Sequence, residues 1–203
     1  GTELLDANNL LDMARSITAP GTDSDWDKTL RLIEMAHWYM TSAPAPLAIT
    51  MPTIANSIRW NNTQLPVDVA ESLRGTLDSD ALALVRMPTR VIRQGEQEGA
   101  PTHFDVILGR ATDASSARPM FVRDGMLIPE VKTKKRLRGY HALVIATDGP
   151  ICELLRNAEN ISHTNWVNNS ANFKGKYKYG PSQLDYVREA AWNVISALHQ
   201  DDK

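Results

Sequence analysis

The chain has 203 residues and a formal net charge of −2, and 42% of its residues are hydrophobic. This length fits one domain, or one domain with a small helical addition, and the apolar fraction is sufficient for a proper core. The near-neutral charge excludes a global field that attracts nucleic acid or anionic membranes, so binding of either would need a local patch.

The single cysteine, Cys152, excludes an internal disulfide framework and a cysteine-rich zinc site. Such cysteine usage is typical of a reducing compartment, and no apolar run reaches the length of a membrane span. We therefore expect a cytoplasmic, intracellular protein without a membrane partner. The chain begins at Gly1 without a methionine or a signal-peptide pattern, so we expect it to be a segment of a longer polypeptide.

The first part of the chain is predicted to be helical. Apolar residues recur at helical spacing over 4–17 and again over 26–39, which predicts an antiparallel helical hairpin. A further short helix is predicted over 69–77, whereas 47–60 is ambiguous because a proline interrupts it. Together these elements define a helical segment over 1–78.

The second part, 79–203, is predicted to be an α+β domain. Apolar stretches rich in β-branched residues predict strands over 81–92, 103–108, 119–122, 126–131 and 140–146. Helices are predicted over 151–156 and 182–199. Pro88 indicates a bulge or an edge position, and Asp124-Gly125 is a strong hairpin dipeptide. We expect a small mixed or antiparallel sheet with helices on one face.

The candidates for catalysis are Asp148, Glu159 and His163. A stand-alone hydrolase built on them would require the three side chains to converge in one pocket. Glu159 and His163 also have the i, i+4 spacing of metal ligands, but no helical pattern covers both, and we predict no metal site. Cys152 stands in an apolar helix start, which favours a buried structural thiol over a nucleophile.

A basic loop is the clearest candidate for anion binding. Its cations are Lys132, Lys134, Lys135, Arg136 and Arg138. Neither a Walker-type phosphate loop nor a Gly-x-Gly-x-x-Gly motif is present, so the sequence offers no self-contained nucleotide cradle. A lysine on such a loop can reach a phosphate as a point charge, although a solvated basic loop is the commoner case.

The segment 173–179 alternates cations and aromatic rings. Its members are Phe173, Lys174, Lys176, Tyr177, Lys178 and Tyr179. Together with Arg136 and Arg138, this pattern could bind nucleic acid by stacking bases and neutralising phosphates. The same alternation is typical of an edge strand that uses lysine to resist aggregation, and we favour an edge strand or loop.

Several motifs occur in an order that resembles a known family. Residues 121–128 read Phe-Val-Arg-Asp-Gly-Met-Leu-Ile and are similar to an F-x-R-[DN]-G-[IM]-x-I stretch in large, mostly uncharacterised bacterial proteins. Those proteins carry an ATP-binding module of the gyrase, heat-shock chaperone, histidine kinase and MutL (GHKL) superfamily. An Asp-Gly-Pro turn at 148–150, Ala-Glu-Asn-x-x-His-Thr-x-Trp at 158–166 and Lys-Tyr-x-Tyr-Gly-Pro at 176–181 continue the resemblance, which spans roughly residues 80–198.

The resemblance implies that an ATP-binding module, with its ATP and Mg²⁺, lies upstream in the same polypeptide. Its signatures are missing from this chain, so we expect no cofactor here and no catalytic activity of the chain alone. The strand-rich part would be similar to the transducer domain of gyrase and MutL, from which a loop lysine reaches the γ-phosphate of ATP.

The candidates for that lysine are Lys132, Lys134 and Lys135. The choice among them stays open, because the topoisomerase Gln-Thr-Lys triplet is replaced by Lys132-Thr133-Lys134. The implied function is a coupling region whose partner is the upstream module. A homodimer and a nucleic-acid partner both remain open.

Overall fold

The computed structural model describes residues 24–111 and 116–199. The chain divides into two compact units, Gly1–Ala45 and Pro46–Lys203. The predicted helix over 4–17, and with it the helical hairpin, lies outside the described residues. The division falls before residue 78, because the helix α3 (Val67–Asp78) packs on strands β2 and β3 of the second unit.

In the first unit, the helix α2 (Ser24–Thr41) confirms the helix predicted over 26–39. Its polar surface carries an ion pair between Arg31 and Glu34, whose charged atoms are 3.7 Å apart. The last turn closes where the Thr41 hydroxyl donates to the carbonyl oxygen of His37 at 2.8 Å.

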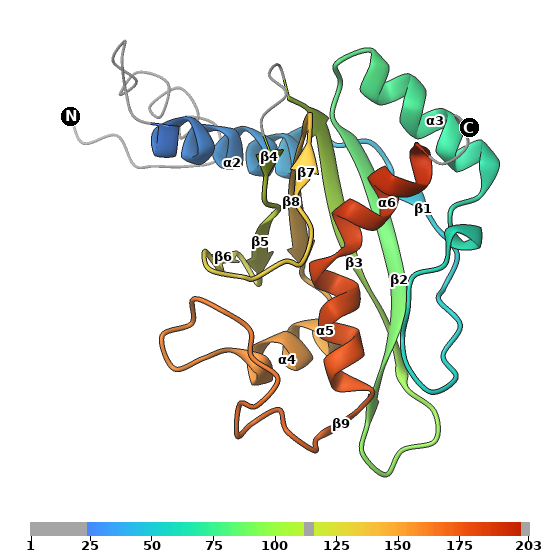
Figure 1. Cartoon of the computed structure of the whole chain (residues 1–203), viewed down its shortest axis with the longest axis vertical. Coiled ribbons are helices and arrows are strands. Elements are labelled where there is room, and N and C mark those ends of the chain that lie inside the picture. Colours follow the sequence, from blue (N-terminus) through green and yellow to red (C-terminus); the bar gives the residue numbers. More distant parts are fainter. Residues whose placement is uncertain (1–23, 112–115, 200–203) are drawn as a thin grey trace. The chain divides into compact units, whose positions relative to one another are not determined.

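The second unit is built on a mixed sheet, which confirms the α+β class (Figure 1). Its strands, in spatial order, are β1 (Leu47–Ala48), β2 (Ala83–Arg93), β3 (Ala100–Arg110), β8 (Tyr140–Ala146), β5 (Met120–Arg123) and β6 (Met126–Leu127). The pairs β1–β2 and β5–β8 are parallel, and the others along this path are antiparallel. A short strand β9 (Tyr177–Lys178) also pairs with β2, and β4 (Ser116–Ala117) pairs with β7 (Leu137–Arg138) in a separate small sheet.

The strand β2 contains Pro88 and still pairs with β3 along most of its length. The carbonyl oxygen of Arg86 accepts a hydrogen bond from the Ile49 N–H on the β1 side. Backbone groups two residues apart in a strand point to the same side, so the nitrogen of Pro88 also lies on that outer side. Among the described strands, only β3 pairs with residue 88, which confirms the edge position predicted from the proline.

The predicted hairpin at Asp124-Gly125 is confirmed between β5 and β6. Both turn residues have positive φ, 48° for Asp124 and 76° for Gly125, as a type I′ turn requires. The strand predicted over 126–131 is shorter than expected, since β6 ends at Leu127. Pro129 follows soon after and has no N–H with which to continue the ladder.

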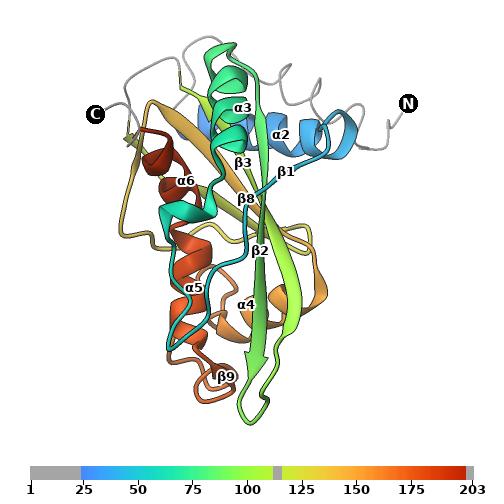
Figure 2. The ribbon, with the colours of Figure 1, turned by 90° about the vertical axis from the view of Figure 1, so that its right-hand side faces the viewer.

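The four longer helices of this unit bury their apolar side chains in one cluster with the sheet. They are α3, α4 (Gly149–Ala158), α5 (Gly180–Arg188) and α6 (Ala190–Leu198). The cluster includes Phe104, Val106 and Leu108, which alternate along β3 and therefore share one face of the sheet. Figure 2 shows α5 and α6 following one another beside the strands, where the Tyr186 ring meets Phe104 edge-on at 5.9 Å.

The final helix, predicted as one element over 182–199, has a break at Glu189. This residue has φ −95° and ψ 2°, outside helical geometry. The Glu189 N–H still donates to Asp185, and the Asn193 N–H donates to Glu189, so the break is a local kink. None of the helices in the described ranges is both long and apolar enough to cross a membrane.

Candidate functional site

Two of the motifs meet at a buried ion pair. The Arg123 guanidinium at the end of β5 donates from Nε to one oxygen of Glu159 and from Nη2 to the other at 3.2 Å. The two side chains are 5% and 1% exposed, so the pair is shielded from solvent. Burial lowers the pKa of Arg123, but the hydrogen bond and charge of Glu159 outweigh it and leave that pKa raised. Arg123 therefore keeps its charge, and the two hydrogen bonds make a fixed link between β5 and the loop after α4.

The loop after α4 is organised around the same carboxylate. His163, with φ 55°, places its Nδ1 at 2.7 Å from the second oxygen of Glu159, while its side chain stays 60% exposed. Asn160 Oδ1 accepts hydrogen bonds from the N–H groups of Thr164 and Asn165 at 2.9 and 3.1 Å. The polar residues of this motif thus fix the loop and attach it to the hairpin.

Trp166 completes the attachment from the apolar side. Its ring is buried and meets Phe121 of β5 edge-on, with centroids 5.3 Å apart. The Thr164 carbonyl accepts from the Glu130 N–H at 2.7 Å, and the Thr164 hydroxyl donates to the Glu130 carboxylate at 3.0 Å. The stretches 121–128 and 158–166 therefore form one structural unit, joined by both apolar and polar contacts.

Asp148 does not join this group. It precedes the first turn of α4, where its carboxylate accepts the Thr102 hydroxyl at 2.5 Å, whereas Glu159 caps the other end of the same helix. Ten helical residues span about 15 Å, so Asp148 is far outside hydrogen-bonding range of Glu159 and His163. The structure brings together two members of the predicted hydrolase set and separates the third.

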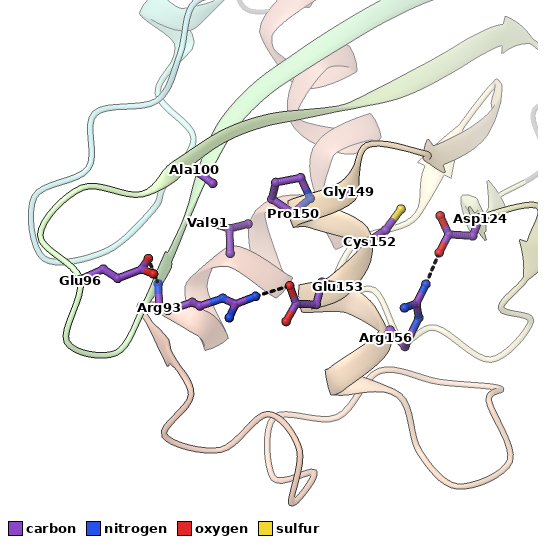
Figure 3. A pocket seen from close by; sticks show the side chains of 10 residues that line it. All are labelled: Val91, Arg93, Glu96, Ala100, Asp124, Gly149, Pro150, Cys152, Glu153 and Arg156. Carbon is purple, nitrogen blue, oxygen red and sulfur yellow. Dashed lines mark hydrogen bonds and ion pairs between the residues drawn. The ribbon is translucent and has the colours of Figure 1, made fainter.

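A cavity of about 600 Å³ opens beside α4 (Figure 3). Its lining residues are Val91, Arg93, Glu96, Ala100, Asp124, Gly149, Pro150, Cys152, Glu153 and Arg156. Both arginines are already paired, Arg93 with Glu153 at 2.5 Å and Arg156 with Asp124 at 2.7 Å. Mixed charges of this kind do not select an anion.

The helix end at this cavity is also occupied. Pro150 has no N–H, the Ile151 N–H donates to the Thr102 hydroxyl at 3.3 Å, and the Cys152 N–H donates to the Asp148 carbonyl at 3.0 Å. These contacts use two of the donors that an anion at a helix N-terminus would need, and Pro150 lacks a third. The cavity therefore lacks the features of a phosphate cradle.

Cys152 at the cavity wall is not an activated nucleophile. Burial and the neighbouring Asp124 raise the pKa of its thiol to about 12. The hydrogen bond with Cys152, and those from Arg156 and Arg123, hold the pKa of Asp124 below its usual value. The thiol is protonated at neutral pH and cannot attack as a thiolate. Among the described residues, no three His, Cys, Asp or Glu side chains gather as a metal site.

The basic loop lies between β6 and β7 and is fixed at both ends. Val131 and Leu137 are buried in the core, and the cations between them, Lys132, Lys134, Lys135 and Arg136, are exposed. Arg138, also exposed, lies on β7 and pairs with Ser116 of β4. The arrangement presents the lysines to solvent on a short, anchored segment.

Two acidic residues of the last helices hold this loop. The Lys134 ammonium is 2.6 Å from an Asp185 oxygen, and the Lys134 backbone N–H donates to Glu189 Oε1 at 2.6 Å. The Lys135 ammonium lies over the Trp192 ring, 5.3 Å from its centroid. Nothing in the sequence near the loop indicates these partners, although the i, i+4 spacing of Asp185 and Glu189 places both on one helix face.

The lysine and aromatic segment is confirmed as an edge strand and loop. Phe173 is buried, and Tyr177 is buried on β9 with its hydroxyl accepting from the Asn157 amide at 2.5 Å. Lys174, Lys176 and Lys178 are exposed. Because the Phe173 and Tyr177 rings pack in the core, they are not available to stack on bases.

No protein-family model, no curated protein and no solved structure matches this chain.

Proposed function

We propose that this chain is the non-catalytic coupling region of a larger ATPase of the GHKL superfamily, acting in the cytoplasm. Its partner is an ATP-binding module upstream in the same polypeptide, which holds ATP and Mg²⁺. A lysine of the loop 132–136 contacts the γ-phosphate and transmits the nucleotide state. The observation that carries the proposal is the attachment of this exposed loop to α5 through Lys134.

The loop has the properties that phosphate contact requires. Its lysines are exposed, so their ammonium groups can extend into solvent and contact a phosphate as point charges. The buried anchors Val131 and Leu137 limit the distance that the loop can move. A phosphate that moves Lys134 therefore also alters the contacts of α5, which is how a phosphate signal would reach the rest of the unit.

The rest of the site supports a structural rather than a catalytic role. The most polar motif, 158–166, uses Glu159 to neutralise a buried arginine and Asn160 to close a loop. The raised pKa of Cys152 argues against a thiol nucleophile. These groups build a rigid body, and a rigid body is what a coupling region needs in order to pass on a movement.

The test is substitution in the proposed parent ATPase. Lys132→Ala, Lys134→Ala and Lys135→Ala are made singly, with Lys174→Ala as the matched control because Lys174 is an exposed lysine outside the loop. At least one loop variant should lower ATP turnover by roughly tenfold or more, since a lost charge contact to the transition state has effects of that order or larger. Unchanged turnover in all three loop variants contradicts the proposal.

A further inference from the structure

The contact of Lys134 with Asp185 of α5 would control how readily the Lys134 ammonium group can bind a phosphate. We infer that Asp185 is an internal competitor for the Lys134 ammonium, and that Glu189 is a positioning residue that holds the loop backbone in place. Lys134 exchanges between Asp185 in the resting state and a polyphosphate in the bound state. This inference rests on the proposed function, because it assigns Lys134 to the phosphate.

The two carboxylates act on different parts of the same residue. Asp185 Oδ2 lies 2.6 Å from the Lys134 ammonium, which is the group that a phosphate would attract. Glu189 Oε1 accepts the Lys134 backbone N–H at 2.6 Å, a contact that does not depend on where the side chain points. The side chain can therefore exchange partners while the backbone of the loop stays attached to Glu189, between α5 and α6.

The exchange leaves no carboxylate stranded. Asp185 Oδ1 is also 3.5 Å from Arg188 Nη1, so the aspartate keeps a cationic neighbour when Lys134 departs. The side chains of Lys134 and Asp185 are 69% and 39% exposed, and an exposed ion pair shifts an equilibrium by only about fivefold or less. A polyphosphate, with several negative charges, can outcompete this single carboxylate for the ammonium group.

The two carboxylates also differ in burial, because one oxygen of Glu189 is shielded from solvent. Glu189 Oε2 is buried and accepts no hydrogen bond from any residue in the described part of the chain. Burial of an unsatisfied carboxylate oxygen is unfavourable, and the hydrogen bond of the other oxygen with the Lys134 N–H offsets part of this cost. The loop contact thus coincides with the kink at Glu189.

Trp192 provides a local probe of the loop. Lys135 stands over its ring, so a polyphosphate that attracts the loop lysines changes the environment of the indole. The Lys134 amide signal and the Trp192 indole signal in an NMR spectrum therefore report on the loop without any measurement of ATP turnover.

The experiment titrates this chain with tripolyphosphate at low salt and follows those two signals. Asp185→Asn should bind about two- to fivefold tighter than the wild type, because the competing charge is gone. Asp185→Glu should return the affinity to the wild-type value, because it restores the competitor. Lys134→Ala and Glu189→Ala should bind more weakly, and Glu189→Ala, which removes the acceptor oxygen, should also speed hydrogen exchange at the Lys134 amide.

The matched control is Glu71→Gln, which removes an exposed carboxylate of α3 and should leave tripolyphosphate binding unchanged. The inference is overturned if Asp185→Asn binds no tighter than the wild type, or if Lys134→Ala binds equally well. Failure of the proposed function is a separate result, namely unchanged ATP turnover in the parent for all three lysine variants. Tighter binding by Asp185→Asn together with unchanged turnover would retain the competition and reject the sensor.

Discussion

Two ion pairs of the second unit differ mainly in burial. Arg123 and Glu159 are almost fully buried, and Glu159 contacts His163 as well. Lys134 and Asp185 are largely exposed, and the aspartate is shared with Arg188. The same charge chemistry therefore yields a fixed link where water is excluded and an exchangeable contact where water can replace either partner.

The largest expected effect is on the buried pair. Glu159→Ala leaves the Arg123 guanidinium without its main partner in a buried environment, and we expect the free energy of unfolding to fall by about 3–5 kcal/mol. Urea denaturation followed by circular dichroism measures the change. The matched control is Glu153→Ala. Glu153 lies on α4, the helix that Glu159 caps, and its pair with Arg93 is exposed, so its loss should have little effect. Equal effects of the two substitutions would contradict the distinction between the two kinds of pair.

An intermediate effect is expected from the thiol beside the buried pair. The pKa of Cys152 is raised to about 12 in the folded chain, whereas an unfolded thiol loses its proton near pH 9. Above that pH only the unfolded state releases the proton, so the free energy of unfolding should fall by up to about 1.4 kcal/mol per pH unit.

Urea denaturation between pH 8 and pH 10 measures this dependence. Cys152→Ala removes the thiol, and its stability should decline less steeply with pH than that of the wild type. Identical slopes in the two proteins would show that Cys152 is not the group responsible. The range stops at pH 10 because the buried Tyr177 and Tyr186, whose pKa values are also raised, contribute above it.

The smallest effect belongs to the exposed pair. Lys134→Ala should change the free energy of unfolding by less than about 1 kcal/mol, because the pair is solvated and screened. A double-mutant cycle with Asp185→Ala isolates the coupling between the two side chains, and that coupling should vanish in about 1 M salt. A coupling as large as that of Arg123 with Glu159 would mean that the loop is locked and cannot exchange partners.

Local patterns in the sequence predicted most of the elements. Residues Asp124 and Gly125 have the left-handed conformations that their hairpin turn needs, and the buried strand over 140–146 has the bounds of β8. The prediction of one continuous helix at the C-terminus missed the kink at Glu189. Local propensity does not contain that kink, because it accompanies a contact with Lys134, 55 residues earlier in the chain.

The site was harder to predict because its pairings are long-range. Glu159 and His163 were identified as polar candidates, but nothing local to them indicates that Arg123 is the partner that neutralises the carboxylate. Likewise, the lysines of the basic loop were evident, whereas the role of Asp185 depends on how the loop and α5 come together. Choosing among the many carboxylates of the chain requires distances, which periodicity and spacing do not supply.

The proline in β2 has a consequence for how this unit behaves at high concentration. The strands β1 and β9 pair with the two ends of β2, and the nitrogen of Pro88 lies on the outer side between them. If a β-strand from a second molecule approached this edge, β2 could not donate a hydrogen bond to it at Pro88. The short strands β1 and β9 would also block the two ends of β2. Pro88 thereby protects β2 from edge-to-edge aggregation. It does so without disturbing the register between β2 and β3 on the other side of the strand.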